Sequence, residues 1–264
     1  MNILVCVRRV PDVSENELQL NSSGSDIERD DLVYSINEWD NYAVEEALQI
    51  TARAGGEVTV VTVGSEEDEE VLRRQMAMGA KHAVLLSDVQ FEGSDGRGVA
   101  TILKSYIEKN PFDLILTGVQ AECGEAQVGG MLAALLDYPF ASLVNEIEVL
   151  DGKKLKIARE IAGGNKEISE IDLPCVLSIQ TGINEPRYVG MRGVKQVASI
   201  EIPIFGSSDL ESAANSVGES NAKIKRCGYF MPVTTSGAEM LTGDREEIAN
   251  ELVERIKARG GIPA

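Results

Sequence analysis

Short β-rich runs alternate with amphipathic segments four times in the first half of the chain, and no other feature constrains the fold as strongly. The apolar runs cover residues 2–7, 57–63, 82–86 and 112–117, and a helical pattern follows each run. A strand followed by a helix, repeated in this way, is typical of a mostly parallel sheet that is covered on both faces. The sequence therefore predicts a doubly wound α/β fold.

The second half of the chain follows a different pattern. After Pro139, three predicted strands at residues 141–150, 155–161 and 166–171 are separated by Gly-containing turns, which indicates a β-hairpin insertion. Residues 174–180 are continuous and apolar, as a last core strand would be. From about residue 200 the chain shows little periodicity until a helix that Asp244 can cap and that Gly260 ends. We predict a nucleotide-binding α/β domain at residues 1–199 and a C-terminal arm at residues 200–264, which packs on another chain.

The balance of charge argues against two classes of partner. The chain has 43 acidic and 25 basic side chains, and its formal net charge is -18. Such a surface repels nucleic-acid phosphates and anionic lipid headgroups. We therefore expect neither nucleic acid nor membrane as a primary partner.

The four cysteines, Cys6, Cys123, Cys175 and Cys227, lie far apart and show no spacing typical of a zinc site or an iron–sulfur cluster. We expect thiols of a reducing compartment and no metal site. The opening residues lack the features of a secretory signal, and no apolar stretch approaches the roughly 18 residues that span a membrane. A soluble, cytoplasmic protein is therefore expected.

Three loops follow predicted parallel strands, at residues 8–12, 63–65 and 118–129. In an open doubly wound sheet, ligands bind beyond the carboxyl ends of the strands, where the strand order reverses. The third loop has glycines at both ends and precedes a helix, so a phosphate could bind there, with Gln120, Glu122 and Gln127 available for a ribose or a base. Its pattern is neither the dinucleotide-binding nor the P-loop motif, and glycines required only for tight turns explain it equally well.

The residues that usually carry catalysis are few. His82 is the only histidine and begins a predicted core strand, where a structural role is favoured over acid–base chemistry. No nucleophile elbow, metal-binding HExxH or paired-carboxylate motif is present. We therefore predict a binding or carrier role and no catalytic residue.

Several blocks of the sequence, in order, resemble the beta subunits of electron-transferring flavoproteins over nearly the whole chain. The blocks are residues 3–12 (ILVCVRRVPD), 35–40 (SINEWD), 43–47 (AVEEA), 76–80 (MAMGA), 118–121 (GVQA), 130–136 (GMLAALL), 159–164 (REIAGG) and 184–188 (NEPRY).

This resemblance implies a heterodimer whose alpha subunit holds FAD. It implies electron transfer from a dehydrogenase to a quinone oxidoreductase or another acceptor, and an AMP in this subunit that supports assembly without reacting. Carried onto this sequence, the implied cofactor contacts are Cys6, Asn37, Glu38, Trp39, Asp40, Val63, Gly118, Val119, Gln120, Ala121, Glu122, Cys123, Gly124, Glu125, Ala126, Gln127 and Val128.

The resemblance also implies two positions that serve electron transfer. Trp39 matches an aromatic residue that lies toward the flavin ring, and an interface aromatic remote from the flavin is the alternative. The segment after residue 187 resembles the family's loop for docking a dehydrogenase, with Met191 as the apolar anchor or, alternatively, as a core gap filler. The implied docking residues are Arg187, Tyr188, Met191 and Lys195.

The loop of residues 118–129 departs from the family pattern. It is one residue shorter than usual, and Cys123 and Gly124 stand where many relatives have aspartates. Some relatives hold a second FAD, reduced by NADH, in place of AMP and split the electron pair. That bifurcating role stays an alternative, as do a stand-alone adenine-nucleotide sensor and an assembly factor without nucleotide.

Overall fold

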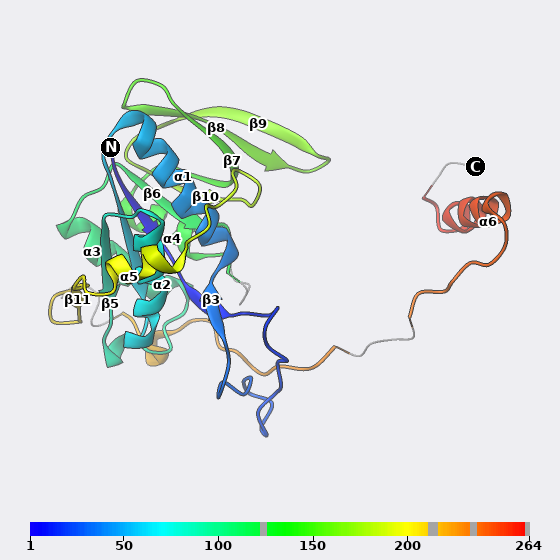
Figure 1. The fold of residues 1–264 in the computed structure, drawn as a ribbon, viewed down its shortest axis with the longest axis horizontal. Coiled ribbons are helices and arrows are strands. Elements are labelled where there is room, and N and C mark those ends of the chain that lie inside the picture. Colours follow the sequence, from blue (N-terminus) through cyan, green and yellow to red (C-terminus); the bar gives the residue numbers. More distant parts are fainter. Residues whose placement is uncertain (122–125, 211–215, 233–236, 262–264) are drawn as a thin grey trace. The chain divides into compact units, whose positions relative to one another are not determined.

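The computed structural model describes residues 1–121, 126–210, 216–232 and 237–261, and within these ranges the main sheet has nine strands (Figure 1). The strands are β1 (Asn2–Cys6), β4 (Glu57–Val63), β5 (His82–Leu86), β6 (Leu114–Gly118), β7 (Phe140–Val149), β8 (Lys154–Ile161), β9 (Asn165–Asp172), β10 (Cys175–Ile179) and β11 (Ile204–Phe205). Their order across the sheet is β11-β5-β4-β1-β6-β10-β7-β8-β9. The short strands β2 (Arg9–Pro11) and β3 (Tyr34–Ile36) form a separate antiparallel pair.

The predicted doubly wound α/β fold is confirmed. All neighbouring strands from β11 to β7 pair in parallel, whereas β8 and β9 extend the sheet in antiparallel pairs. Strand β1 pairs with β4 on one side and with β6 on the other. Because the chain moves outward from β1 through β4 and β5 before it returns to β6, the strand order reverses between β1 and β6.

Helices cover both faces of this sheet. In the unit that contains the sheet, the helices are α1 (Glu38–Ala54), α2 (Glu69–Met78), α3 (Gly96–Lys109), α4 (Val128–Leu136) and α5 (Met191–Val197), and a further helix, α6 (Arg245–Ala258), belongs to a second unit of the chain. Residues of α1 and α2 share one buried cluster with Ile3 and Val5, while residues of α3 and α4 share a second cluster with Leu4. This division follows from the alternation of side chains along β1, which is buried on both faces. Among the described residues, no helix is both long and apolar enough to cross a membrane.

The helix boundaries show which sequence signals act in the structure. Asp244 caps α6 as predicted, because its carboxylate accepts from the backbone N–H groups of Glu246 and Glu247 at 2.9 Å. Asn37 stands at the predicted cap of α1, yet its side chain makes no capping hydrogen bond. Ser65 opens a 3-10 turn at residues 66–68, and α2 itself begins at Glu69.

The three strands predicted after Pro139 are present as β7, β8 and β9. Strand β10, predicted as a last core strand, lies between β6 and β7 and is parallel to both. The antiparallel strands therefore lengthen one edge of the main sheet.

By its contacts the chain divides into two units, Met1–Gln19 with Glu28–Cys227, and Leu20–Ile27 with Gly228–Ala264. The sequence placed the start of the arm at residue 200, whereas the described residues from 200 to 227 belong to the first unit, where β11 pairs with β5. Helix α6 lies in the second unit, in which Tyr229 N donates to Gly24 O at 2.9 Å. Packing of the arm on another chain stays a prediction.

Candidate functional site

Three predicted site residues end three neighbouring strands. Cys6 ends β1, Val63 ends β4 and Gly118 ends β6. Because these strands are adjacent and parallel, their ends lie at one edge of the sheet, at the point where the strand order reverses. We call this edge, together with the first turn of α1, the switch-point site.

Asn37 has one side-chain atom with a hydrogen-bond partner and one without. It is fully buried, and its Nδ2 donates to Gln120 O at 2.9 Å, which joins the start of α1 to the loop after β6. Its Oδ1 is buried and accepts no hydrogen bond from the described residues. A buried carbonyl oxygen without a donor costs free energy, so Asn37 fits a ligand that supplies an N–H or O–H group.

Asp40 holds the two sides of the switch-point site together. Its Oδ2 accepts from Arg8 N and its Oδ1 from Gly118 N, both at 2.9 Å, so one carboxylate bridges the loops that follow β1 and β6. Burial raises the pKa of Asp40 to about 7, although the polar interactions with the Asn37 side chain and with the backbone N–H groups of Gly118 and Arg8 act in the opposite direction. A Cβ atom on Gly118 would lie 2.4 Å from Asp40 Oδ1, so only glycine permits this approach.

Cys6 and Glu38 differ sharply in their surroundings. Burial, with a smaller contribution from the charge of Asp40, raises the pKa of the Cys6 thiol far above its ordinary value. This thiol is therefore protonated at neutral pH and lacks the nucleophilic character of a thiolate. Glu38 is exposed in the first turn of α1, where its charge favours the positive end of the helix dipole.

The loop of residues 118–128 is described in part. Glu122, Cys123, Gly124 and Glu125 lie outside the described residues. Val119 N donates to Ile179 O at 3.0 Å, Ala121 is half-buried, and Ala126 is exposed with a positive φ of 48°. Gln127 stands before Val128, the first residue of α4, and its buried Oε1 accepts no hydrogen bond from the described residues. Gln127 thus offers a second acceptor that a ligand could satisfy.

Trp39, also in the first turn of α1, lines a hollow of about 530 Å³. Its Nε1 donates to Gln180 Oε1 at 3.2 Å, and Gln180 Nε2 donates to Glu160 Oε2 at 3.2 Å. The hollow is also lined by Gln120, Phe140, Leu143 and Ser178. It therefore adjoins the loop that contacts Asn37, and an aromatic ring lies in its wall.

Backbone strain is present in the wall of this hollow. Leu143 adopts a φ of 58°, which is uncommon for a residue with a branched side chain. The strand register shifts nearby, between Val144 and Glu146 in the pairing of β7 with β8. Strain of this kind gathers at functional sites, which supports the hollow as part of the working surface.

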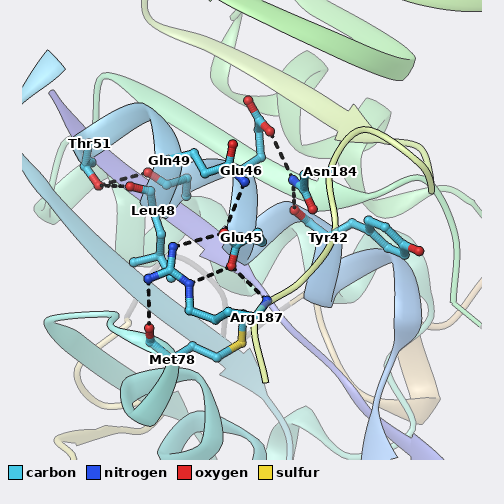
Figure 2. A network of polar contacts seen from close by, with 10 residues as sticks. Tyr42, Glu45, Glu46, Leu48, Gln49, Thr51, Met78, Asn184 and Arg187 are labelled. Carbon is cyan, nitrogen blue, oxygen red and sulfur yellow. Dashed lines mark hydrogen bonds and ion pairs between the residues drawn. The ribbon is translucent and has the colours of Figure 1, made fainter. Parts of the chain in front are cut away.

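The predicted docking residues lie on a separate surface, before and within α5. Tyr188 exposes 91% and Met191 74% of the residue surface, and Lys195 is also exposed. Met191 therefore fills no gap in this chain's own core. Arg187 instead points to α1, where its Nε and Nη2 donate to Glu45 at 2.8 and 3.0 Å (Figure 2). The structure thus places Cys6, Val63 and Gly118, with Asn37 and Asp40, at one edge of the sheet and the docking residues before and within α5.

Several residues that shape these surfaces were not predicted from the sequence. Gln180 holds Trp39, Glu45 holds Arg187, and Arg73 donates to three carbonyl oxygens at the end of α5. Of these, only Glu45 lies in a block that carries the resemblance. Nothing in the spacing of Arg73 or Gln180 indicates their contacts, because their partners are distant in sequence.

The comparisons with known proteins agree on one family. The model of the electron transfer flavoprotein domain matches residues 26–208. The chain is 36% identical over 260 residues to the electron transfer flavoprotein subunit beta of Methylophilus methylotrophus, covering 97% of this chain and 98% of the relative. It is also 36% identical over 261 residues to the subunit of the same name from Thermoanaerobacterium thermosaccharolyticum, covering 98% of this chain and 99% of the relative.

A third relative carries a different name. The subunit CarD of the caffeyl-CoA reductase-Etf complex from Acetobacterium woodii is 34% identical over 263 residues, which cover 98% of this chain and 99% of the relative. The similarity therefore extends over nearly the whole length of all three relatives.

Proposed function

The chain belongs to the beta subunits of the electron transfer flavoprotein family, and from this premise we propose that it works as half of a heterodimer whose alpha subunit holds the FAD. The heterodimer would take electrons from a dehydrogenase and pass them to a quinone oxidoreductase or another acceptor. When bound, the flavin supplies the redox chemistry. The residues of this chain would place and enclose the flavin, and we assign no catalytic residue to them.

We propose that the switch-point site binds AMP. The observation that carries this proposal is the buried Asn37 Oδ1, which accepts no hydrogen bond from the described residues although it lies where the strand order reverses. Gln127 Oε1 offers a second buried acceptor, and the amino groups or hydroxyls of a nucleotide are suitable donors. Asp40 would keep the two loops of the site at a fixed separation.

We propose that Trp39 lies at the edge of the flavin ring. Its indole lines the hollow and is oriented by Gln180, so the ring has a defined position before a partner binds. Aromatic side chains at interfaces supply a large apolar face together with a polar atom that needs a partner, and Trp39 has both.

Docking of the dehydrogenase is assigned to residues 186–200. This stretch contains Arg187, Arg192 and Lys195 and no acidic residue, in a chain whose net charge is -18. Tyr188 and Met191 add exposed apolar surface. The matching surface of the dehydrogenase would be an apolar depression with acidic groups at its rim.

The experiment that tests this function is the nucleotide content of the purified heterodimer. Asn37→Ala is the variant, and Asn165→Ala, at the exposed start of the edge strand β9 and away from the switch-point site, is the matched control. We expect one FAD and one AMP per wild-type heterodimer, loss of AMP with retention of FAD in Asn37→Ala, and full AMP in the control. If the wild-type heterodimer contains two FAD instead of one FAD and one AMP, the AMP proposal is wrong and the bifurcating role takes its place. A colourless homodimer would support the nucleotide sensor, and a complex without nucleotide would support the assembly factor.

A further inference from the structure

Helix α5 is too short to be stable by itself. It has seven residues, Met191–Val197, and none of them is buried. An isolated helix of one or two turns does not repay its nucleation cost, and the carbonyl groups of its last turn have no partner within the helix. The docking surface therefore depends on contacts that the rest of the chain makes with α5.

Arg73 provides such contacts at the carboxyl end of α5. Its Nη1 donates to Val197 O at 2.8 Å, to Ala198 O at 3.1 Å and to Ile200 O at 3.0 Å. Its Nη2 pairs with Glu69 one turn earlier on α2. A guanidinium at this place satisfies carbonyls that the helix leaves unpaired, and its charge complements the negative end of the helix dipole.

The middle of α5 packs closely against α2, the helix that carries Arg73. A Cβ atom on Gly193 would lie 3.4 Å from Ala77 O and 3.6 Å from Ala77 Cβ. The face of α5 that carries Gly193 thus lies against the last turn of α2. Met191 and Val194 remain exposed, at 74% and 37%.

A second guanidinium holds the chain that leads into α5. Arg187 Nε donates to Glu45 Oε2 and its Nη2 to Glu45 Oε1, while Nη1 reaches Met78 O at 3.5 Å (Figure 2). Just before it, Asn184 Nδ2 donates to Glu46 Oε2 at 3.0 Å and to Tyr42 O at 3.2 Å. Figure 2 shows the Arg187 side chain between Glu45 on α1 and Met78 at the end of α2.

We propose that Arg73 and Arg187 are positioning residues for dehydrogenase docking, which together hold α5 in its docking conformation before the partner arrives. This inference rests on the docking role proposed above. Arg73 and Arg187 would act through α5 and would not touch the flavin. A surface that is ordered in advance loses less conformational entropy on binding. Arg73 and Arg187 would therefore strengthen docking without making a contact with the dehydrogenase.

The test uses the intact heterodimer with four forms of this chain: wild type, Arg73→Gln, Arg73→Lys and Arg74→Gln. Arg74 is the exposed neighbour of Arg73, so Arg74→Gln removes the same charge without touching α5 and serves as the matched control. Hydrogen exchange of the backbone amides of residues 193–200 measures the local stability of α5. Reduction of the heterodimer's flavin by the dehydrogenase from the same cells, over a range of dehydrogenase concentrations, measures docking.

We expect the amides of residues 193–200 to exchange about tenfold faster or more in Arg73→Gln, which corresponds to the loss of one charge-assisted hydrogen bond. The dehydrogenase concentration at half-saturation should rise by a similar factor, while the limiting rate of flavin reduction and the FAD content stay those of the wild type. Arg73→Lys should fall between wild type and Arg73→Gln, because one ammonium group cannot reproduce the guanidinium's fixed set of donors. If Arg73→Gln does not assemble, Arg73→Lys decides by the same two measurements.

If the amides of residues 193–200 exchange at the wild-type rate in the Arg73 variants, Arg73 does not hold α5 and the proposal is wrong. Faster exchange with an unchanged half-saturation concentration would overturn its role in docking. If no dehydrogenase reduces the wild-type heterodimer, the proposed function fails and the docking role with it, whereas the exchange result still decides whether Arg73 holds α5.

Discussion

The ion pair between Glu45 and Arg187 permits a quantitative prediction, because its two members differ in burial. Glu45 exposes 5% of its side chain and Arg187 47%. Three donors of Arg187 reach the Glu45 carboxylate, namely Nε at 2.8 Å, Nη2 at 3.0 Å and the backbone N at 3.2 Å, and Gln49 Nε2 adds a fourth at 3.1 Å. The carboxylate is therefore the group that depends on its partner, whereas the guanidinium can also be hydrated.

We expect Arg187→Gln to cost more stability than Glu45→Gln at neutral pH. Removing one member of a fully buried ion pair costs about 3–5 kcal/mol of stability, whereas an exposed ion pair contributes about 0–1 kcal/mol. Because Arg187 is half-exposed and Glu45 is buried, we expect a cost of roughly 2–3 kcal/mol for Arg187→Gln. Glu45→Gln should cost about 1–2 kcal/mol, because glutamine keeps one acceptor and the arginine turns toward water. The double variant should show a coupling energy of about 1 kcal/mol or more.

The assay is the thermal midpoint of the heterodimer at one protein concentration, where about 2–4 °C corresponds to 1 kcal/mol for a chain of this size. Glu70→Gln is the control, since Glu70 exposes 70% of its side chain and lies 3.9 Å from Arg9 Nε, and it should change stability by less than about 0.5 kcal/mol.

Burial alone would raise the pKa of Glu45, but the bonds from Arg187 and Gln49 lower it overall. The pair's contribution is therefore present above the ordinary glutamate pKa and is lost as the pH falls through the lowered one. Equal costs for the two single variants, or costs no larger than that of Glu70→Gln, would refute this reasoning.

Two further predictions concern the switch-point site and the docking surface. Burial raises the pKa of Asp40 to about 7, so the folded chain favours the protonated side chain. The contribution of Asp40 to the free energy of unfolding is therefore greatest below its ordinary pKa of 3.8 and is lost as the pH rises through 7. Between these values wild type should lose stability relative to Asp40→Asn by up to about 1.4 kcal/mol per pH unit, and parallel pH–stability curves of the two heterodimers would contradict the assignment. Met191→Ala should change stability by less than about 0.5 kcal/mol but should weaken flavin reduction by the dehydrogenase, whereas Val89→Ala, at similar exposure, should change neither. Equal reduction kinetics in these two variants would rule out Met191 as the anchor.

The strands and helices of the core could be predicted because buried positions are occupied by apolar residues in regular patterns. Strands such as β1 and β10 are buried on both faces and read as continuous apolar runs, and the covering helices repeat their apolar residues along one face. Shorter elements show no such pattern. The pair of β2 and β3, the strand β11 and the helix α5 have two to seven residues each, which is too few for a period to appear.

Strand order and the contacts of the docking segment could not be predicted for a related reason. The apolar run of β10 does not indicate that the strand lies between β6 and β7, because that depends on the packing of α4 and of the antiparallel strands. Arg73 lies 124 residues from Val197, and Glu45 lies 142 residues from Arg187. Only the fold brings these residues together. Asn37 and Asp40 were identified through the resemblance, and the structure adds that the two differ, with Asp40 satisfied and Asn37 Oδ1 not.

Helix α1 connects the two surfaces on which the proposed function depends. Its first turn carries Trp39 and Asp40 at the switch-point site, and its second and third turns carry Glu45 and Glu46, which hold the chain that leads into α5. Glu45 lies six positions after Trp39, which is about 9 Å along a helix with a rise of 1.5 Å per residue. Because one face of α1 is buried against the sheet, we expect this helix to keep the two surfaces at a fixed separation. A dehydrogenase that docks on α5 would therefore be held at a defined distance from the aromatic ring proposed to face the flavin. Loss of the contacts of Arg73 or Arg187 should lower the occupancy of that arrangement without altering the flavin's own surroundings.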